Sequence, residues 1–363
     1  MGHFTRRAVR TFTAGVLFLV AFGGNITSAE KRAKVVPDSP TANDAHRANA
    51  IEMERSSPES GSDGVARQDG RNFTTVMTMN PDDWDEDRIS IFFMWEEDDR
   101  LHMLYVGGRS ANGVGYASSS DGLEWSRSRS PVLDPPEGPQ GVSYPVVMPQ
   151  VKLCLAYGDG GRPRTRGLYA WRSSAPGHYS LADELEPMRM VDQGPRQTSL
   201  YPGDVRLIDD KWVLISHGAV NGTSHIFRSE SADGIRWGKA IEILAPAPGF
   251  DAGNVSEPSV YRDAKSGNWY MWYIANPSRT VPGTIIGRAM SRDGRKWSER
   301  RLFLRPEDVD AEAHYISKAF QIDTPSGSFL YFTVTDRDGG CRLVRYNVSD
   351  PHLASPSSSS ENY

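Results

Sequence analysis

Cysteine is scarce in this sequence: Cys154 and Cys341 are the only two among 363 residues. A fold held together by a set of several disulfides is therefore excluded. The two cysteines fall in the second and fifth of the repeated units described below, so a disulfide between them would have to join non-adjacent sheets. We expect two buried thiols instead.

An excess of positive charge is also missing. The chain has 41 Lys and Arg residues against 46 Asp and Glu residues, which gives a formal net charge of -5. Proteins that bind nucleic acid concentrate Lys and Arg, because these residues displace counterions from phosphates. Nucleic acid is therefore not an expected partner.

A long apolar run is the third absence. The apolar stretch from Phe12 to Phe22 is shorter than the ~20 residues of a membrane-spanning helix. Basic residues precede it, and small residues ending at Ala29 follow it. This order predicts a secretory signal peptide over residues 1–29, with an uncleaved signal anchor as the alternative. We expect the mature protein to be secreted, or periplasmic in a Gram-negative bacterium, and free of the membrane.

Composition divides the rest of the chain. Residues 30–71 and 351–363 have few large apolar side chains and cannot bury enough surface to offset the entropy of ordering. They predict a disordered linker and a disordered tail around a folded region at 72–350. Five Asn-x-Ser/Thr sequons fit a secreted glycoprotein, or arise by chance in a turn-rich chain: Asn25, Asn72, Asn221, Asn254 and Asn347.

A repeated motif is the most informative feature of the folded region. The pattern Ser-x-Asp-Gly-x-x-Trp ends at Trp125, Trp237 and Trp297, and a degenerate copy ends at Tyr179. The successive intervals are 54, 58 and 60 residues. In this motif Asp can accept backbone hydrogen bonds, Gly supplies a positive φ and Trp covers the bend. We interpret it as a structural turn that closes each unit, rather than as a ligand site.

Each unit contains short runs rich in aromatic and β-branched residues, bounded by Gly, Asn, Asp or Pro, which is typical of antiparallel strands. Five such units of about 55 residues predict an all-β protein, a five-bladed β-propeller of four-stranded antiparallel blades. A β-sandwich would not explain the regular return of one turn. The predicted blades cover residues 85–125, 143–179, 200–237, 254–297 and 314–348.

Two of these units carry a family resemblance. The strings from Val114 to Trp125 and from Glu257 to Tyr273 resemble blade signatures of the five-bladed-propeller glycoside hydrolases. That superfamily includes glycoside hydrolase family 43, with arabinofuranosidases and xylosidases, and families 32, 62, 68, 117 and 130. The resemblance covers residues 82–348 and implies a central channel lined by the first strand of every blade, with the active site at one end. It implies no required cofactor, and it leaves a structural calcium ion possible.

Glycoside cleavage needs one protonated carboxyl and one ionised carboxylate. Alignment of the units on their second strands places Glu257 level with Ser143, Pro202 and Ser317. The resemblance implies that Glu257 is the general acid, and that Asp204 is either the residue supporting the acid or the base.

The first unit departs from the family pattern. Its alignment places Ile91 opposite Glu257, where the resemblance implies an Asp base. Asp85 and Asp87 lie a few residues earlier and are candidates for the base if the preceding loop folds inward. An acidic cluster of this kind is more often a solvated loop.

Four further residues are candidates for substrate binding: Lys318, Tyr144, Ser143 and His314. Lys318 could hold a carboxylate or a sugar hydroxyl, or serve as a counter-charge to Glu257. Tyr144 could stack on a sugar ring. His314 loosely resembles the channel histidine near calcium in some family 43 enzymes. His217 and His225 have no metal-ligand spacing around them, so no metal ligand is assigned.

Two functions remain open. The first is a secreted glycoside hydrolase that cleaves a poly- or oligosaccharide through Glu257 and a second carboxylate. The second is a non-catalytic propeller, expected to be a monomer like the first, that binds carbohydrate or a protein. The pair of Glu257 and Asp204 favours the enzyme, and Ile91 favours the binding protein.

Overall fold

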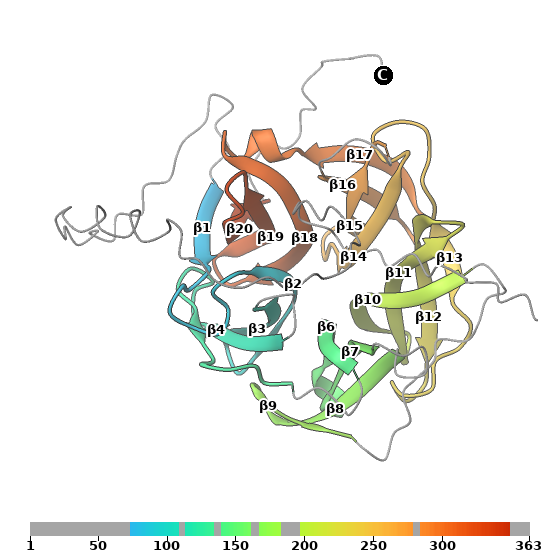
Figure 1. The fold of residues 1–363 in the computed structure, drawn as a ribbon. Coiled ribbons are helices and arrows are strands. Elements are labelled where there is room, and N and C mark those ends of the chain that lie inside the picture. The colour runs from blue at the N-terminus through green and yellow to red at the C-terminus, as the bar shows by residue number, and fades with distance from the viewer. Residues whose placement is uncertain are drawn as a thin grey trace, which may run out of the picture. The chain divides into compact units, whose positions relative to one another are not determined.

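The protein folds into five four-stranded antiparallel sheets arranged in a ring (Figure 1). This is seen in a computed structural model that describes residues 73–108, 113–133, 139–160, 167–182, 197–278 and 284–348. The predicted five-bladed β-propeller is therefore confirmed. The predicted signal peptide, linker and tail lie outside the described residues, as do Asn25 and Asn72.

The blades follow one another along the chain, and in blades 1 to 4 the strands run outward from the ring axis in chain order (Figure 1). Blade 1 contains β2 (Ile89–Glu97), β3 (Arg100–Gly107), β4 (Gly113–Ser119) and β5 (Ser126–Arg127). Blade 2 contains β6 (Pro139–Met148), β7 (Leu153–Gly160), β8 (Gly167–Ala175) and β9 (His178–Leu181). Blade 3 contains β10 (Gln197–Ile208), β11 (Lys211–Val220), β12 (Thr223–Ser231) and β13 (Ile241–Leu244). Blade 4 contains β14 (Asn254–Arg262), β15 (Trp269–Asn276), β16 (Ile285–Ser291) and β17 (Ser298–Leu304).

Blade 5 joins the two ends of the folded region. It contains β18 (Ala313–Thr324), β19 (Gly327–Asp336) and β20 (Cys341–Asn347), and its outer strand is β1 (Phe73–Thr78). The ring of Phe73 packs against Tyr346, with centroids 5.1 Å apart. The sequence predicted only three strands for this unit, because no local repeat marks β1 as its fourth. Pairing of β1 with β20 joins the two ends of the folded region within one blade and so closes the ring.

The repeated motif forms the turn between the third and fourth strands of its blade. In blade 1 the Ser119 hydroxyl accepts a hydrogen bond from Gly122 N at 2.8 Å. The Asp121 carboxylate accepts from Leu123 N at 2.8 Å and from Glu124 N at 3.1 Å. The same bonds recur in blades 3 and 4 around Ser231 with Asp233 and around Ser291 with Asp293. The turn is therefore structural, as its sequence predicted.

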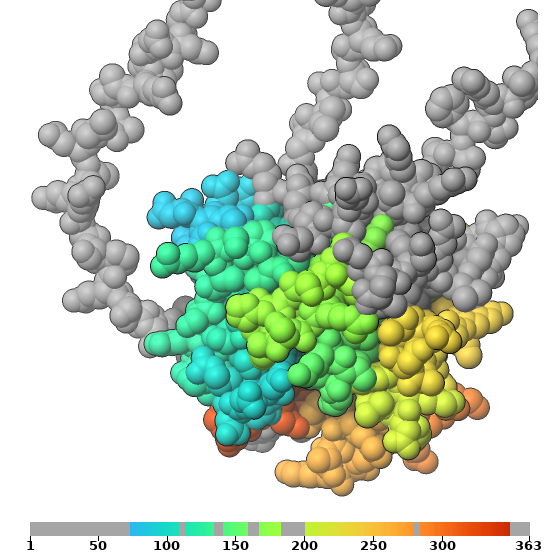
Figure 2. Space-filling view, turned by 90° about the horizontal axis from the view of Figure 1, so that it is seen from below, coloured from blue at the N-terminus to red at the C-terminus, as the bar shows by residue number. Residues whose placement is uncertain are grey.

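Large apolar side chains fill the spaces within and between blades. Trp171, Tyr105, Tyr273 and Tyr331 are among the largest fully buried side chains. Neighbouring blades lie side by side, as Figure 2 shows for blades 1 and 2. Both cysteines are free and buried, which confirms the prediction of two thiols. None of the helices in the described ranges is long and apolar enough to cross a membrane.

Candidate active site on the inner strands

The first strand of each blade faces the axis of the ring, and each of these five inner strands contacts the next (Figure 1). Every inner strand has a β-bulge, at which its register with the second strand shifts. Such bulges re-aim a side chain and are frequent next to active sites. The bulges contain, in blade order, Ile91, Tyr144, Gly203, Glu257 and Lys318.

Four of these residues have a left-handed backbone, with φ of 36° at Ile91, 54° at Tyr144, 50° at Glu257 and 41° at Lys318. This conformation is unfavourable for residues other than glycine, asparagine and aspartate, so the surrounding sheet must enforce it. The bulges define one level across the ring. Ile91 lies at that level, as the alignment predicted. In blades 2, 3 and 5 the level is occupied by Tyr144, Gly203 and Lys318, each one residue later than the aligned Ser143, Pro202 and Ser317.

Glu257 is a buried carboxyl at this level, with 7% of its surface exposed. Its Oε2 accepts a hydrogen bond from Lys318 N at 2.7 Å. Burial raises the pKa of Glu257 above its ordinary value, and the Lys318 amide and ammonium oppose that increase. The protonated form, which a general acid requires, therefore persists to a higher pH than in a solvated glutamate.

Lys318 occupies the position next to Glu257, and its ammonium is committed to the protein. Nζ donates to the carbonyl oxygens of Gly203 and of Pro258, the latter at 3.0 Å. Burial lowers the pKa of Lys318 to about 8, whereas the charges of Asp204 and Glu257 raise it. The side chain thus ties blades 3, 4 and 5 together beside the carboxyl of Glu257.

Asp204 lies one residue beyond the bulge of blade 3 and is fully buried. Its Oδ1 accepts from Val205 N at 2.8 Å and pairs with Arg206 Nε at 3.1 Å. Its Oδ2 accepts from Val260 N at 2.7 Å and from Arg206 Nη2 at 3.1 Å. Each oxygen therefore has two partners, and the carboxylate joins blade 3 to blade 4.

Asp85 is buried within blade 1. Its carboxylate accepts from the Tyr105 hydroxyl at 2.9 Å and pairs with Arg127 at 3.0 Å. Asp251 of blade 4 makes the same two contacts, with Tyr273 at 2.9 Å and Arg300 at 3.2 Å. The repetition of this arrangement in a second blade indicates that Asp85 anchors the loop before β2 to its own blade.

The other predicted residues lie at or before the bulged level. Asp87 is exposed, two residues before β2 begins. Ser143 is partly exposed on β6. His314 lies near the start of β18, with its ring 4.2 Å from that of Tyr315. No group of three or more potential metal ligands occurs within the described part of the chain.

An aromatic cluster borders the bulged level in blades 2 and 3. Tyr144 lies 5.1 Å from Tyr201 and 5.3 Å from His217 between ring centroids, and Tyr157 lies 4.5 Å from Tyr201. Burial and then the charge of Glu257 raise the pKa of Tyr144, which places that hydroxyl within the field of the carboxyl. Sequence analysis did not identify Tyr201, although it directly precedes the aligned Pro202.

His217 is a second member that the sequence analysis set aside. It faces Tyr201 across β10 and β11, and the two rings stack at 5.3 Å. The side chain is buried, and its Nδ1 has no hydrogen-bond partner among the described residues. Burial and the nearby charge of Lys318 lower the pKa of His217 to about 3. The imidazole is therefore neutral at physiological pH and retains a free hydrogen-bonding atom.

The chain can be compared with protein-family models, curated sequences and solved structures. No protein-family model and no curated protein sequence match the chain. Solved structures do match. A thermostable family 43 glycoside hydrolase has a TM-score of 0.60 at 16% identity, over 76% of this chain and 96% of the other. The fold is that of the propeller glycoside hydrolases.

Further propeller glycoside hydrolases give similar values. One is described with the family 130 mannoside phosphorylases, a family said to contain glycoside hydrolases that target beta-1,2 mannosidic linkages in Candida mannan. It has a TM-score of 0.58 at 18% identity, covering 84% of this chain and 99% of that one. A glycosyl hydrolase from Bacteroides ovatus has a TM-score of 0.57 at 16% identity, covering 74% and 86% of the two chains. At these identities the likeness is one of fold.

Proposed function

We propose that this protein binds and cleaves a glycosidic bond of an oligo- or polysaccharide at the bulged level of its inner strands, with Glu257 as the general acid. The supporting observation is the setting of Glu257. A buried carboxyl with a raised pKa, fixed by the Lys318 amide at 2.7 Å, suits proton donation to a leaving oxygen.

The neighbouring residues would have supporting roles. Asp204 and Lys318 set the electrostatic environment of the acid, because both side chains are buried next to it. The negative charges of Asp204 and Glu257 both act on the ammonium of Lys318. Tyr144 and Tyr201 offer ring faces for a sugar, and neutral His217 offers a hydrogen-bonding nitrogen.

Asp87 is the proposed base. Donors of blades 3 and 4 hold the carboxylate of Asp204, and donors of blade 1 hold that of Asp85. Asp87 is the remaining carboxylate among the candidates from the sequence, and it lies exposed just before β2. We also propose that the protein acts outside the cytoplasm, since residues 1–29 have the sequence of a secretory signal peptide.

The decisive experiment compares Glu257→Gln with Glu299→Gln, a change at an exposed glutamate of β17. Both proteins are screened on oligosaccharides and on aryl glycosides with acidic leaving groups. We expect Glu257→Gln to lose roughly 100-fold or more on oligosaccharides, within the range of general acid catalysis, and less on aryl glycosides that need little protonation. Wild-type activity should fall as pH rises through the raised pKa of Glu257. Equal rates for both variants and the wild type would refute the proposal.

A second function is supported by Ile91. An apolar side chain occupies the bulged level in blade 1, where the resemblance implies a base. We propose as the alternative a propeller that binds carbohydrate without cleaving it. In that case Tyr144→Ala should weaken glycan binding, Glu257→Gln should leave affinity nearly unchanged, and wild-type protein should release no product. Product release that depends on Glu257 would exclude this alternative.

A further inference from the structure

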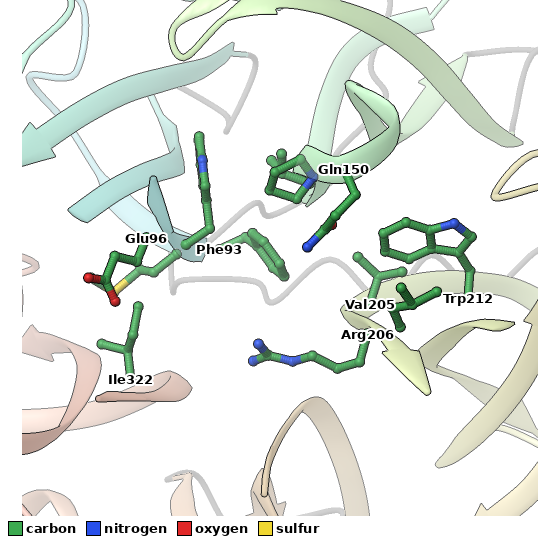
Figure 3. A pocket seen from close by; sticks show the side chains of 12 residues that line it. Phe93, Glu96, Gln150, Val205, Arg206, Trp212 and Ile322 are labelled. Atoms are coloured by element: carbon green, nitrogen blue, oxygen red, sulfur yellow. The ribbon is translucent and has the colours of Figure 1, made fainter. Parts of the chain in front are cut away.

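A cavity of about 280 Å³ lies at the end of the ring where the inner strands finish (Figure 3). Its lining comes from the second halves of β2, β10 and β18, from the end of β6 and the turn after it, and from β11. Glu257, Lys318 and Tyr144 lie earlier along their inner strands and do not line it. The cavity is therefore separate from the candidate active site.

Arg206 of β10 is the cationic group of this cavity. Its Nε and Nη2 are held by the Asp204 carboxylate at 3.1 Å, and its guanidinium lies 5.3 Å from the ring centroid of Phe320. Nη1 has no partner within the described residues, and 35% of the side chain is exposed. Arg206 is therefore held in place on one side and has a donor available on the other, which lowers the entropy cost of binding an anion.

A second polar group converges on the same space. Gln150, in the turn after β6, is exposed and has no hydrogen-bond partner within the described residues. Figure 3 shows Gln150 and Arg206 reaching into the cavity from different elements. The ring of Phe93 and the side chains of Val205 and Trp212 form apolar walls of the same cavity (Figure 3).

One negative side chain also lines the cavity. Glu96 extends at the rim beyond Phe93, away from Arg206 (Figure 3). The anion-binding donors are therefore on one side of the cavity, and the carboxylate is on the other. A ligand would meet a fixed guanidinium and an amide at one end and aromatic and aliphatic walls along its body.

We propose that this cavity is a second binding site, which takes a small organic carboxylate with a flat apolar body. The carboxylate accepts hydrogen bonds from Arg206 Nη1 and from the Gln150 amide, and the body of the ligand packs against Phe93 and Trp212. Charged hydrogen bonds of this kind are roughly twice as strong as neutral ones, so the carboxylate should decide the affinity.

The test uses benzoate and benzyl alcohol, which share a ring and differ in the anionic group. Each is titrated into the full chain by calorimetry and by tryptophan fluorescence, since Trp95 and Trp212 line the cavity. We expect benzoate to bind with a millimolar or lower dissociation constant and benzyl alcohol to bind about tenfold more weakly or not at all. Equal affinities for the two compounds would overturn the proposal. So would the absence of benzoate binding at concentrations up to about 50 mM, which is about 50 times a millimolar dissociation constant.

Two variants locate the site. Gln150→Ala removes an exposed side chain with no partner in the described structure and should fold normally, and Arg206→Lys keeps the charge but loses the forked geometry. Each should weaken benzoate binding about fivefold or more, whereas Arg236→Gln, a change at an exposed arginine, should not. Benzoate binding unaffected by Gln150→Ala and Arg206→Lys would refute this location. Glu257→Gln should leave benzoate binding intact, so failure of this site and failure of the proposed function are distinguishable.

Discussion

Replacement of Lys318 by Met tests the electrostatics of the bulged level. In the wild type, Lys318 Nζ donates to the carbonyls of Gly203 and Pro258 and lies beside the carboxyl of Glu257. Met fills a similar volume without the charge. Its side chain leaves two carbonyls without this donor and Glu257 without a counter-charge. Removal of one partner from a buried ionic group costs about 3–5 kcal/mol, so we expect a loss of about 3 kcal/mol in the free energy of unfolding at pH 7.5.

The pH dependence gives a sharper expectation. The pKa of Lys318 falls from 10.5 to about 8 on folding. Between these values the unfolded chain holds a proton that the folded chain has released, so the free energy of unfolding rises with pH in this window. A difference of about 2.5 pKa units corresponds to about 3 kcal/mol. Lys318→Met lacks this group, so its stability deficit relative to wild type should grow by about 3 kcal/mol between pH 7.5 and 10.5.

Urea denaturation of both proteins at several pH values measures this difference, and subtraction cancels the titration of the groups that they share. Lys265→Met is the matched control, because Lys265 is exposed in the turn after β14. Its stability should follow the wild type within about 0.5 kcal/mol throughout. A deficit for Lys318→Met that stays constant from pH 7.5 to 10.5 would show that the folded protein does not lower the pKa of Lys318.

Two further predictions concern groups that hold the blades together. Asp204→Asn weakens the contacts of Asp204 with Val260 and Arg206, so it should lower the free energy of unfolding by about 3 kcal/mol. The control Asp209→Asn, at an exposed aspartate, should change it by less than about 0.5 kcal/mol. Similar denaturation midpoints for the two variants would contradict the role of Asp204 in joining blades 3 and 4. Tyr105→Phe and Tyr273→Phe each remove one 2.9 Å hydrogen bond to a buried aspartate. Each should therefore lower the free energy of unfolding, measured by heat or urea, by about 1–2 kcal/mol. A large decrease for only one of the two variants would show that Asp85 and Asp251 are not equivalent.

Repetition made the fold predictable. A turn whose Asp and Gly make the same local hydrogen bonds in three blades is encoded within a few residues, and its return at intervals of about 55 residues sets the number of blades. β1 could not be assigned in this way, because its partner β20 lies at the opposite end of the folded chain. A contact of that separation leaves no local periodicity in the sequence.

The candidate site was predictable only in part, because the β-bulges determine which residue of each inner strand lies at the common level. Alignment on second strands found Glu257 and Ile91 but placed blades 2, 3 and 5 one residue early, since an extra residue in one strand shifts every later alignment by one. The burial of Asp204 and its four contacts depend on donors from blade 4 and from its own strand. A sequence gives the carboxylate but not the donors that surround it.

Comparison among the blades also bears on why an ionisable residue occupies position 257. Blade 1 holds Ile91 in the same left-handed bulge, with φ of 36°, so the architecture accepts an apolar side chain at this level. A buried carboxyl beside a buried ammonium is costly to desolvate, and an apolar pair of similar volume is often at least as stable. The fold therefore does not require Glu257 and Lys318. Their presence at the level where the inner strands converge, next to an imidazole with an unpaired nitrogen, supports a role in binding or chemistry instead.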